Sequence, residues 1–98
     1  MAQKAILIDE KDNVATVTSQ IGSEKTVAVL NPEGTVVSEI RINEDLRFGH
    51  KIAVENLDAG VNIVKYGEVI GVSSQPIKKG QWVHTHNVKS VRLDTSGK

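Results

Sequence analysis

The sequence predicts an all-β fold of many short strands, and three observations support this class. Fourteen Val and nine Ile stand against five Leu and six Ala, and β-branched side chains favour strands because they lose rotamer freedom in helices. Apolar Ile40 and Ile42 alternate with polar Glu39 and Arg41, which is the two-residue period of a half-buried strand. Turn-forming residues recur between short apolar runs. We therefore expect a small barrel or an irregular assembly of sheets.

The expected strands follow one another along the chain. Short runs rich in Val, Ile and Thr place them at residues 5–8, 14–18, 26–30, 36–42, 62–66, 69–72 and 82–88. Gly, Pro, Asn and Asp mark the turns between them, at residues 12–13, 22–23, 31–34, 58–60, 66–68 and 78–80. The only helical pieces that we expect are single turns at residues 44–46 and 54–57. The polar tail, residues 95–98, is expected to fray.

Two segments of the chain share a pattern. Residues 57–64 and 77–84 share one order: an apolar residue, then two further residues, then a glycine, then two residues and again an apolar residue. Two copies are too few for a solenoid, which needs about three stacked units. We interpret each copy as a turn whose glycine supplies a positive φ before a strand.

Length and charge limit the classes of function. A chain of 98 residues is expected to form one domain, residues 1–98, with a modest core and no room for separate catalytic and cofactor domains. Twelve Lys and Arg are balanced by twelve Asp and Glu, so neither nucleic acid nor an anionic membrane is an expected partner. The absence of Cys excludes disulfides and thiolate metal sites. Without an apolar leader or spanning segment, we expect a cytoplasmic protein.

The densest group of chemically active side chains lies at residues 82–87. On one strand, His84 and His86 would project from the same face and converge on a small target. Such imidazoles bind a divalent metal, hydrogen-bond a carboxylate or transfer a proton near neutral pH. Two imidazoles are fewer than the three protein ligands of a usual catalytic zinc site, so His50, an acid or another chain would have to complete it. The alternative is a pair of structural histidines.

Two further groups carry polar chemistry. In residues 48–51, Gly49 allows close backbone approach before His50 and Lys51; the alternative is a turn with a solvated lysine. Lys65 and Tyr66 precede a glycine and could present an ammonium and a phenol to an anionic hydroxy acid; the alternative is a hairpin with a half-buried tyrosine. No nucleotide-binding, serine-hydrolase, zinc-protease or EF-hand spacing occurs in the chain.

Five short motifs, taken in order, resemble a known family. They lie at residues 49–53, 57–60, 65–71, 77–80 and 83–87. Together they resemble the small N-terminal SAF domain of the altronate dehydratase family, hydro-lyases of sugar acids whose relatives include galactarate dehydratase and the sulfolactate sulfo-lyases. The resemblance is densest over residues 48–89. It implies a β-clip fold, a long bent hairpin folded back on itself.

The resemblance also implies a partner and a shared site. The chain looks like the small subunit of a split enzyme that acts with a large dehydratase subunit on a hydroxy-acid substrate, with Fe²⁺ or another divalent metal in the complex. By this resemblance His84 and His86 are the expected catalytic residues and the expected metal ligands, completed by another chain. The expected substrate-binding residues are His50, Lys65, Tyr66 and Asn87.

Two other functions stay open at this point. The first is the alpha subunit of a sulfolactate sulfo-lyase, and the second is a non-catalytic SAF binding or assembly module. As a small subunit, the isolated chain should be folded but inactive. An apolar face with the candidate anchors Phe48, Trp82 and Val88 should then make it self-associate until the large subunit covers that face.

Overall fold

The computed structural model describes residues 3–22 and 24–90, and within these residues every regular element is a strand. The all-β prediction is confirmed. None of these residues belongs to a helix long and apolar enough to cross a membrane. The described strands are β1 (Gln3–Ile6), β2 (Val14–Val17), β3 (Thr26–Leu30), β4 (Val36–Arg41), β5 (Lys51–Ala53), β6 (Asn62–Lys65), β7 (Glu68–Ser73), β8 (Trp82–Val83) and β9 (Val88–Ser90).

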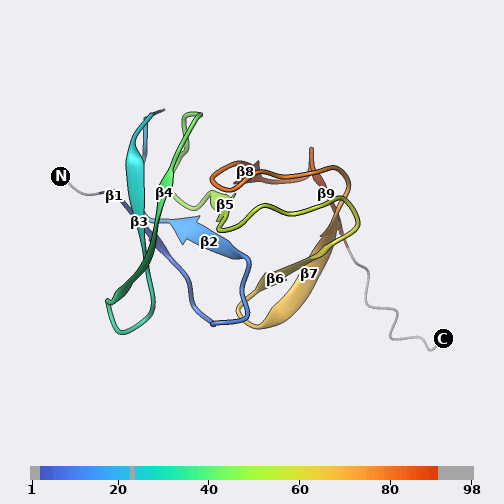
Figure 1. Cartoon of the computed structure of the whole chain (residues 1–98), viewed down its shortest axis with the longest axis horizontal. Coiled ribbons are helices and arrows are strands. Elements are labelled where there is room, and N and C mark those ends of the chain that lie inside the picture. Colours follow the sequence, from blue (N-terminus) through green and yellow to red (C-terminus); the bar gives the residue numbers. More distant parts are fainter. Residues whose placement is uncertain (1–2, 23, 91–98) are drawn as a thin grey trace.

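The strands form two sheets (Figure 1). The larger sheet has the order β4-β3-β1-β2-β5-β8, and the smaller one has the order β6-β7-β9. β1 and β3 are parallel, whereas the other neighbours are antiparallel. The larger sheet curls until its end strands β4 and β8 approach each other. Gly80, just before β8, shows this approach: a Cβ built on it would lie 2.7 Å from the carbonyl oxygen of Arg41 in β4. This curled arrangement is consistent with a β-clip fold.

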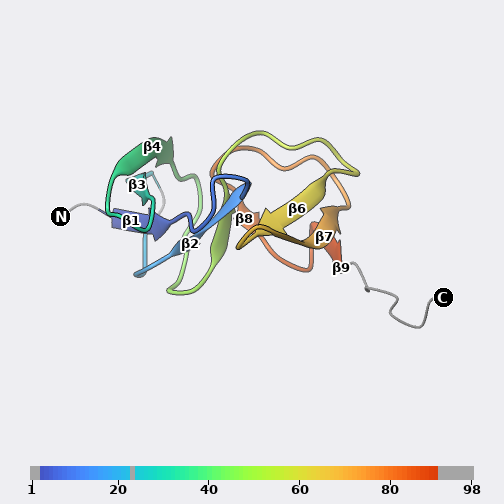
Figure 2. The same ribbon diagram turned by 90° about the horizontal axis from the view of Figure 1, so that it is seen from below.

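Two apolar cores share the central strands β2 and β5 as a common wall. On β2, Val14 faces one core while Ala15 and Val17 face the other. On β5, Ile52 and Ala53 divide in the same way. The first core contains Ala5, Ala15, Val17, Ile21, Val27, Val29, Ile40, Ile42, Leu46 and Ile52. The second core contains Val14, Ala53, Leu57, Ile63, Ile77 and Val83. Figure 2 shows the smaller sheet of β6, β7 and β9 at the opposite end of the domain from β1, β3 and β4.

A turn with the same construction occurs three times, at residues 46–49, 57–60 and 77–80, and we call these the glycine turns. The fourth residue of each turn is a glycine: Gly49, Gly60 and Gly80, with φ of 88°, 84° and 90°. Each glycine pairs with the last residue of another strand, namely Val17, Ser73 and Ala53 in turn. The glycine N–H donates to the carbonyl of that strand residue over 2.8 Å. The N–H of the strand residue donates to the carbonyl of the residue after the glycine. The predicted positive φ of Gly60 and Gly80 is confirmed, and the turn at residues 46–49 is a third copy of the pattern.

A clamp of polar side chains joins the β1–β2 loop to the β6–β7 hairpin. The buried Asp12 accepts the N–H of Gly67 over 2.8 Å. The buried Asn13 donates from Nδ2 to the carbonyl of Asn62 and accepts the N–H of Val64 at Oδ1, both over 2.8 Å. Since the hairpin turn contains Tyr66 and Gly67, both with positive φ, the clamp positions a turn of the I′ kind in which two left-handed residues connect the strands.

Several predicted elements differ from the observed ones. The strand expected at residues 82–88 is wrong, because β8 ends at Val83 and a turn separates it from β9. The single helical turns do not form, since Leu46 and Leu57 instead make isolated β-bridges with Ile21 and Ile77. The short strand β5 was not expected at all. The predicted frayed tail, residues 95–98, lies outside the described residues.

Candidate functional site

The three histidines of the chain gather around one indole ring. Trp82 stacks against His50 with ring centroids 4.5 Å apart and 16° between the planes. It stacks against His84 at 4.9 Å and 9°, and His86 lies at 5.2 Å, tilted by 44°. Aromatic pairs of this kind contribute about 0.5–1.5 kcal/mol beyond their buried area. We call these four residues the histidine–tryptophan cluster.

A turn, rather than a strand, brings His84 and His86 into the cluster. The side chain of Asn87 accepts the N–H of His84 at Oδ1 and donates from Nδ2 to the carbonyl of Trp82, both over 2.9 Å. Its N–H also donates to the carbonyl of His84 over 3.0 Å. These bonds use backbone groups that a neighbouring strand would otherwise pair, so β8 stops. Asn87, predicted to bind substrate, is buried and its amide is engaged in this turn.

The neighbours of His50 define its protonation. Its Nδ1 accepts the N–H of Arg47 over 3.2 Å, so the neutral ring carries its proton on Nε2. Burial lowers the pKa of His50, and the charges of Arg47, His84 and Lys51 lower it further. The carboxylate of Glu44 opposes them. His50 is therefore a neutral donor through Nε2–H, suited to hydrogen-bonding an oxygen atom of a ligand.

The same turn position supports a structural role for the His50 ring. In the third glycine turn Gln81 occupies the equivalent place, and its Oε1 accepts the N–H of Lys78 over 2.7 Å. The imidazole of His50 thus closes the first turn as the amide of Gln81 closes the third. One ring nitrogen serves the fold, and only Nε2 is free for a ligand.

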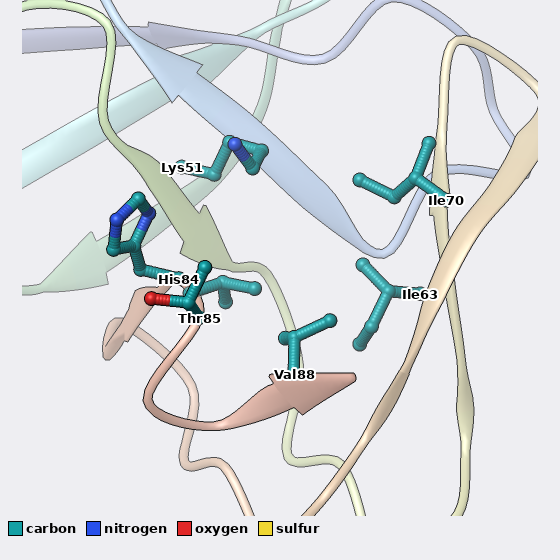
Figure 3. Close-up of a pocket in the computed structure, with 7 residues that line it drawn as sticks. Lys51, Ile63, Ile70, His84, Thr85 and Val88 are labelled. Atoms are coloured by element: carbon teal, nitrogen blue, oxygen red, sulfur yellow. The ribbon is translucent and has the colours of Figure 1, made fainter. Parts of the chain in front are cut away.

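A pocket of about 220 Å³ opens beside His84, between the two sheets. Lys51, His84 and Thr85 provide its polar side, and the apolar remainder is lined by Ile63, Ile70, Val83 and Val88. Figure 3 shows Lys51 and His84 on one side and Ile63 and Ile70, from the β6–β7 hairpin, on the other. His84 therefore belongs to both the pocket and the histidine–tryptophan cluster. Lys51 was not among the predicted site residues.

Lys51 in the larger sheet lines this pocket, and Lys65 in the smaller sheet adds positive charge that acts on Lys51. Burial lowers the pKa of Lys51, and the charge of Lys65 lowers it further. Lys65 places its Nζ 4.7 Å from the centre of the Tyr66 ring, a cation–π distance. Tyr66 itself is 56% exposed at the tip of the hairpin and does not line the pocket. The charge of Lys65 thus acts on Lys51, but neither Lys65 nor Tyr66 lines the pocket.

The described residues do not assemble a complete metal site. No group of three His, Cys, Asp or Glu side chains that could hold an ion occurs within residues 3–22 and 24–90. His50 already uses Nδ1 in its turn. His84 and His86 alone give two imidazoles, fewer than the usual three protein ligands.

The comparison with known families decides which kind of domain this is. The family model of the altronate/galactarate dehydratase SAF domain matches residues 3–91. The chain belongs to this family of SAF domains. The resemblance inferred from the five motifs is confirmed, and the match extends well before the motif-rich residues 48–89.

Relatives of this SAF domain are lyases of two kinds. Altronate dehydratase from Escherichia coli (strain K12) is 32% identical over 85 residues, covering 87% of this chain and 16% of that enzyme. Altronate dehydratase from Bacillus subtilis (strain 168) is 43% identical over 51 residues, covering 52% of this chain and 10% of that enzyme. The alpha subunit of (2R)-sulfolactate sulfo-lyase from Chromohalobacter salexigens is 33% identical over 73 residues, covering 74% of this chain and 76% of that subunit. The chain thus spans a small fraction of each dehydratase and most of the sulfo-lyase subunit.

The predicted interface anchors differ in exposure. Phe48 is 76% exposed and lies in the glycine turn that leads to His50. Trp82 and Val88 are partly buried, packed against the first and second core respectively. Of the three, Phe48 is the side chain that a partner could bury most fully.

Proposed function

We propose that this chain is the small SAF-domain subunit of a sugar-acid dehydratase and removes water from an aldonic or aldaric acid together with a larger catalytic chain. In this proposal His84 and His86 act in the active site that the two chains share. His50 and Lys65 help to hold the hydroxy acid, and Tyr66 contributes from the tip of the hairpin. A divalent ion of the complex would take its remaining ligands from the larger chain.

The observation that carries this proposal is the shared position of His84. It stacks on Trp82 beside two other imidazoles and also lines the pocket with Lys51. Elimination of water from a hydroxy acid needs a group that moves a proton and cations that hold the carboxylate. The cluster offers imidazoles for the first task, and the lysines offer charge for the second. The exposed Phe48 supports a partner at this end of the domain.

A second candidate is the alpha subunit of a sulfolactate sulfo-lyase. It is favoured by the relative of that name, most of whose length the chain covers. Sulfolactate carries a carboxylate and a sulfonate. Among residues 3–22 and 24–90 no carboxylate forms an ion pair with Lys51 or Lys65, which suits a doubly charged acid. The two candidates differ in leaving group, water or sulfite, so one set of assays separates them.

The test is reconstitution with a larger dehydratase chain or with a large sulfo-lyase chain. Altronate and galactarate are assayed for formation of a 2-oxo acid, and (2R)-sulfolactate is assayed for sulfite release. Each chain alone should be inactive, and one pairing should turn over one class of acid. Absence of turnover in every pairing, despite complex formation by light scattering, would contradict an enzymatic role.

Histidine variants then test the site. In the active complex, His84→Ala and His86→Ala should each lower kcat/KM by about 100-fold or more, equivalent to about 2.7 kcal/mol. The free energy of unfolding should fall by no more than about 0.5–1.5 kcal/mol, the contribution of one aromatic pair with Trp82, because both side chains are otherwise exposed. Lys25→Met, at an exposed position next to β3, is the control. Near-normal turnover in both histidine variants would remove these residues from the site.

A further inference from the structure

We propose that the pocket between the two sheets is a binding site for the carboxylate of a small organic acid, with Lys51 as its anchor. The inference rests on the proposed function for the identity of the acid, a hydroxy acid. The binding itself is a property of this chain and can be measured without a partner.

The pairing of β5 with β8 directs Lys51 toward the pocket. Lys51 lies opposite Val83 in the antiparallel register, and both residues are on the face of these strands that carries Ala53 and the second core. The aliphatic stem of Lys51 therefore covers apolar surface while its ammonium reaches the pocket. His84 and Thr85 follow directly in the chain and add hydrogen-bonding groups at the same end.

The charge around Lys51 is positive and unneutralised. Within the part of the chain that the structure describes, no carboxylate forms an ion pair with Lys51 or with Lys65. Burial and the charge of Lys65 both lower the pKa of Lys51 and so disfavour its ammonium. Two cations near one pocket without an acidic partner are unfavourable to each other, and a bound anion removes this cost.

The other wall of the pocket selects the kind of anion. Ile63, Ile70 and Val88 line it, so it offers apolar contact rather than hydrogen bonds. A volume of about 220 Å³ corresponds to roughly seven water molecules of about 30 Å³ each. This space accepts a short acid with its carboxylate toward Lys51 and its carbon chain toward the isoleucines. It is too small for a nucleotide, for which pockets are usually larger.

The experiment is a methyl NMR titration of the 98-residue chain. The probes are D-glycerate and D-gluconate, with glycerol as the neutral control and sodium chloride at equal ionic strength as the control for simple ions. Saturable shifts of the Ile63, Ile70, Val83 and Val88 methyl groups are expected with at least one acid, in the millimolar range. Glycerol should cause none. Chloride shifts as large as those of the acids, or no saturable shift with either acid, would overturn the site.

Variants assign the anchor. Lys51→Met keeps the aliphatic volume and should weaken binding tenfold or more, whereas Lys51→Arg should stay within about threefold. Lys65→Met should weaken binding less, by roughly threefold to tenfold, and Lys25→Met should have no effect. Because Lys51→Met relieves repulsion between two cations, its thermal midpoint should not fall, so lost binding cannot be ascribed to unfolding. Unchanged affinity in Lys51→Met would overturn the inference.

The two proposals fail separately. A reconstituted complex that dehydrates sugar acids, with acid binding by this chain independent of Lys51, would contradict the anchor alone. Acid binding that depends on Lys51, in a chain that supports no turnover with any larger partner, would contradict the dehydratase function alone.

Discussion

The glycines provide a set of substitutions that separates backbone strain from steric crowding. Gly60→Ala introduces strain alone, because φ is +84° and nothing lies within 4 Å of the added Cβ. Gly80→Ala introduces both, since φ is +90° and the Cβ would lie 2.7 Å from the carbonyl oxygen of Arg41 and 3.0 Å from Cγ2 of Ile40. Gly71→Ala introduces crowding without a positive φ, with the Cβ 2.5 Å from Cγ1 of Val88 and 2.7 Å from the carbonyl oxygen of Lys89.

The expected losses follow from these contacts. Left-handed backbone costs an alanine about 1–2 kcal/mol, and the reduced entropy of the unfolded chain returns about 0.4–1 kcal/mol. Gly60→Ala should therefore lower the free energy of unfolding by about 0.5–1.5 kcal/mol. Overpacking against backbone atoms, which cannot rotate away, costs about 1–3 kcal/mol, the loss expected for Gly71→Ala. Gly80→Ala should lose about 2–4 kcal/mol, the approximate sum of both effects.

Urea denaturation followed by circular dichroism measures all three variants, with an unchanged m-value as the sign that the unfolded state is unaffected. Gly49→Ala is the matched control, because it repeats the open surroundings of Gly60 with φ of +88° and should give the same loss. If Gly80→Ala and Gly60→Ala agree within about 0.5 kcal/mol, the third glycine turn does not pack rigidly against β4. The reasoning from close approach would then be refuted.

Three further predictions concern the clamp and the turn histidine. Asp12→Ala removes the acceptor of the Gly67 and Asp9 N–H groups. It should cost about 3–6 kcal/mol, since each of these two hydrogen bonds to a charged group contributes about 1.5–3 kcal/mol. Amide exchange confined to the β6–β7 turn should rise, and an unchanged exchange rate there would contradict the clamp. In NMR titrations His50 should have a midpoint below its ordinary pKa of 6.5, because burial and neighbouring positive charges lower its pKa. The unfolded chain then binds more protons, and the free energy of unfolding falls as the pH drops from 6.5 through that midpoint. A midpoint at or above 6.5 would contradict this account of the surroundings of His50. His50→Gln should recover the part of the His50→Ala loss that comes from the turn hydrogen bond, about 1 kcal/mol, because a glutamine closes the third turn in the same way; the loss of stacking on Trp82 should remain in both variants.

Local patterns in the sequence predicted the strands that are long enough to show a period. The alternation around Ile40 and Ile42 is an example, since both are buried. β5 has three residues between two turns, too few to show a period, and its strand character comes from pairing with β2 and β8. The turn after β8 was missed because β-branched and aromatic residues suggested continuation, while the decisive bonds come from one side chain, Asn87.

Sequence patterns are local, so they predicted only those parts of the candidate site that lie close together in the chain. The neighbours Trp82, His84 and His86 were predicted as one group from their spacing, although their geometry belongs to a turn. The contact of His50 with Trp82 joins two distant segments, which no local pattern shows. Lys51 looked like a solvated lysine of a turn because β5 was not predicted as a strand. Without that strand, the sequence does not indicate that Lys51 lies on the face that meets the second core. A third copy of the glycine pattern at residues 46–49 was the available signal for that strand.

The common wall formed by β2 and β5 makes the domain indivisible. If the smaller sheet detached, Val14 and Ala53 would lose their core while their neighbours Ala15 and Ile52 stayed packed in the other. Opening either half therefore exposes apolar surface on strands that the other half needs. Unfolding should consequently proceed as one cooperative event, in which amides from both sheets exchange with a single free energy. Lys51 lies on this wall in β5 and lines the pocket, so it keeps its position as long as the domain is folded.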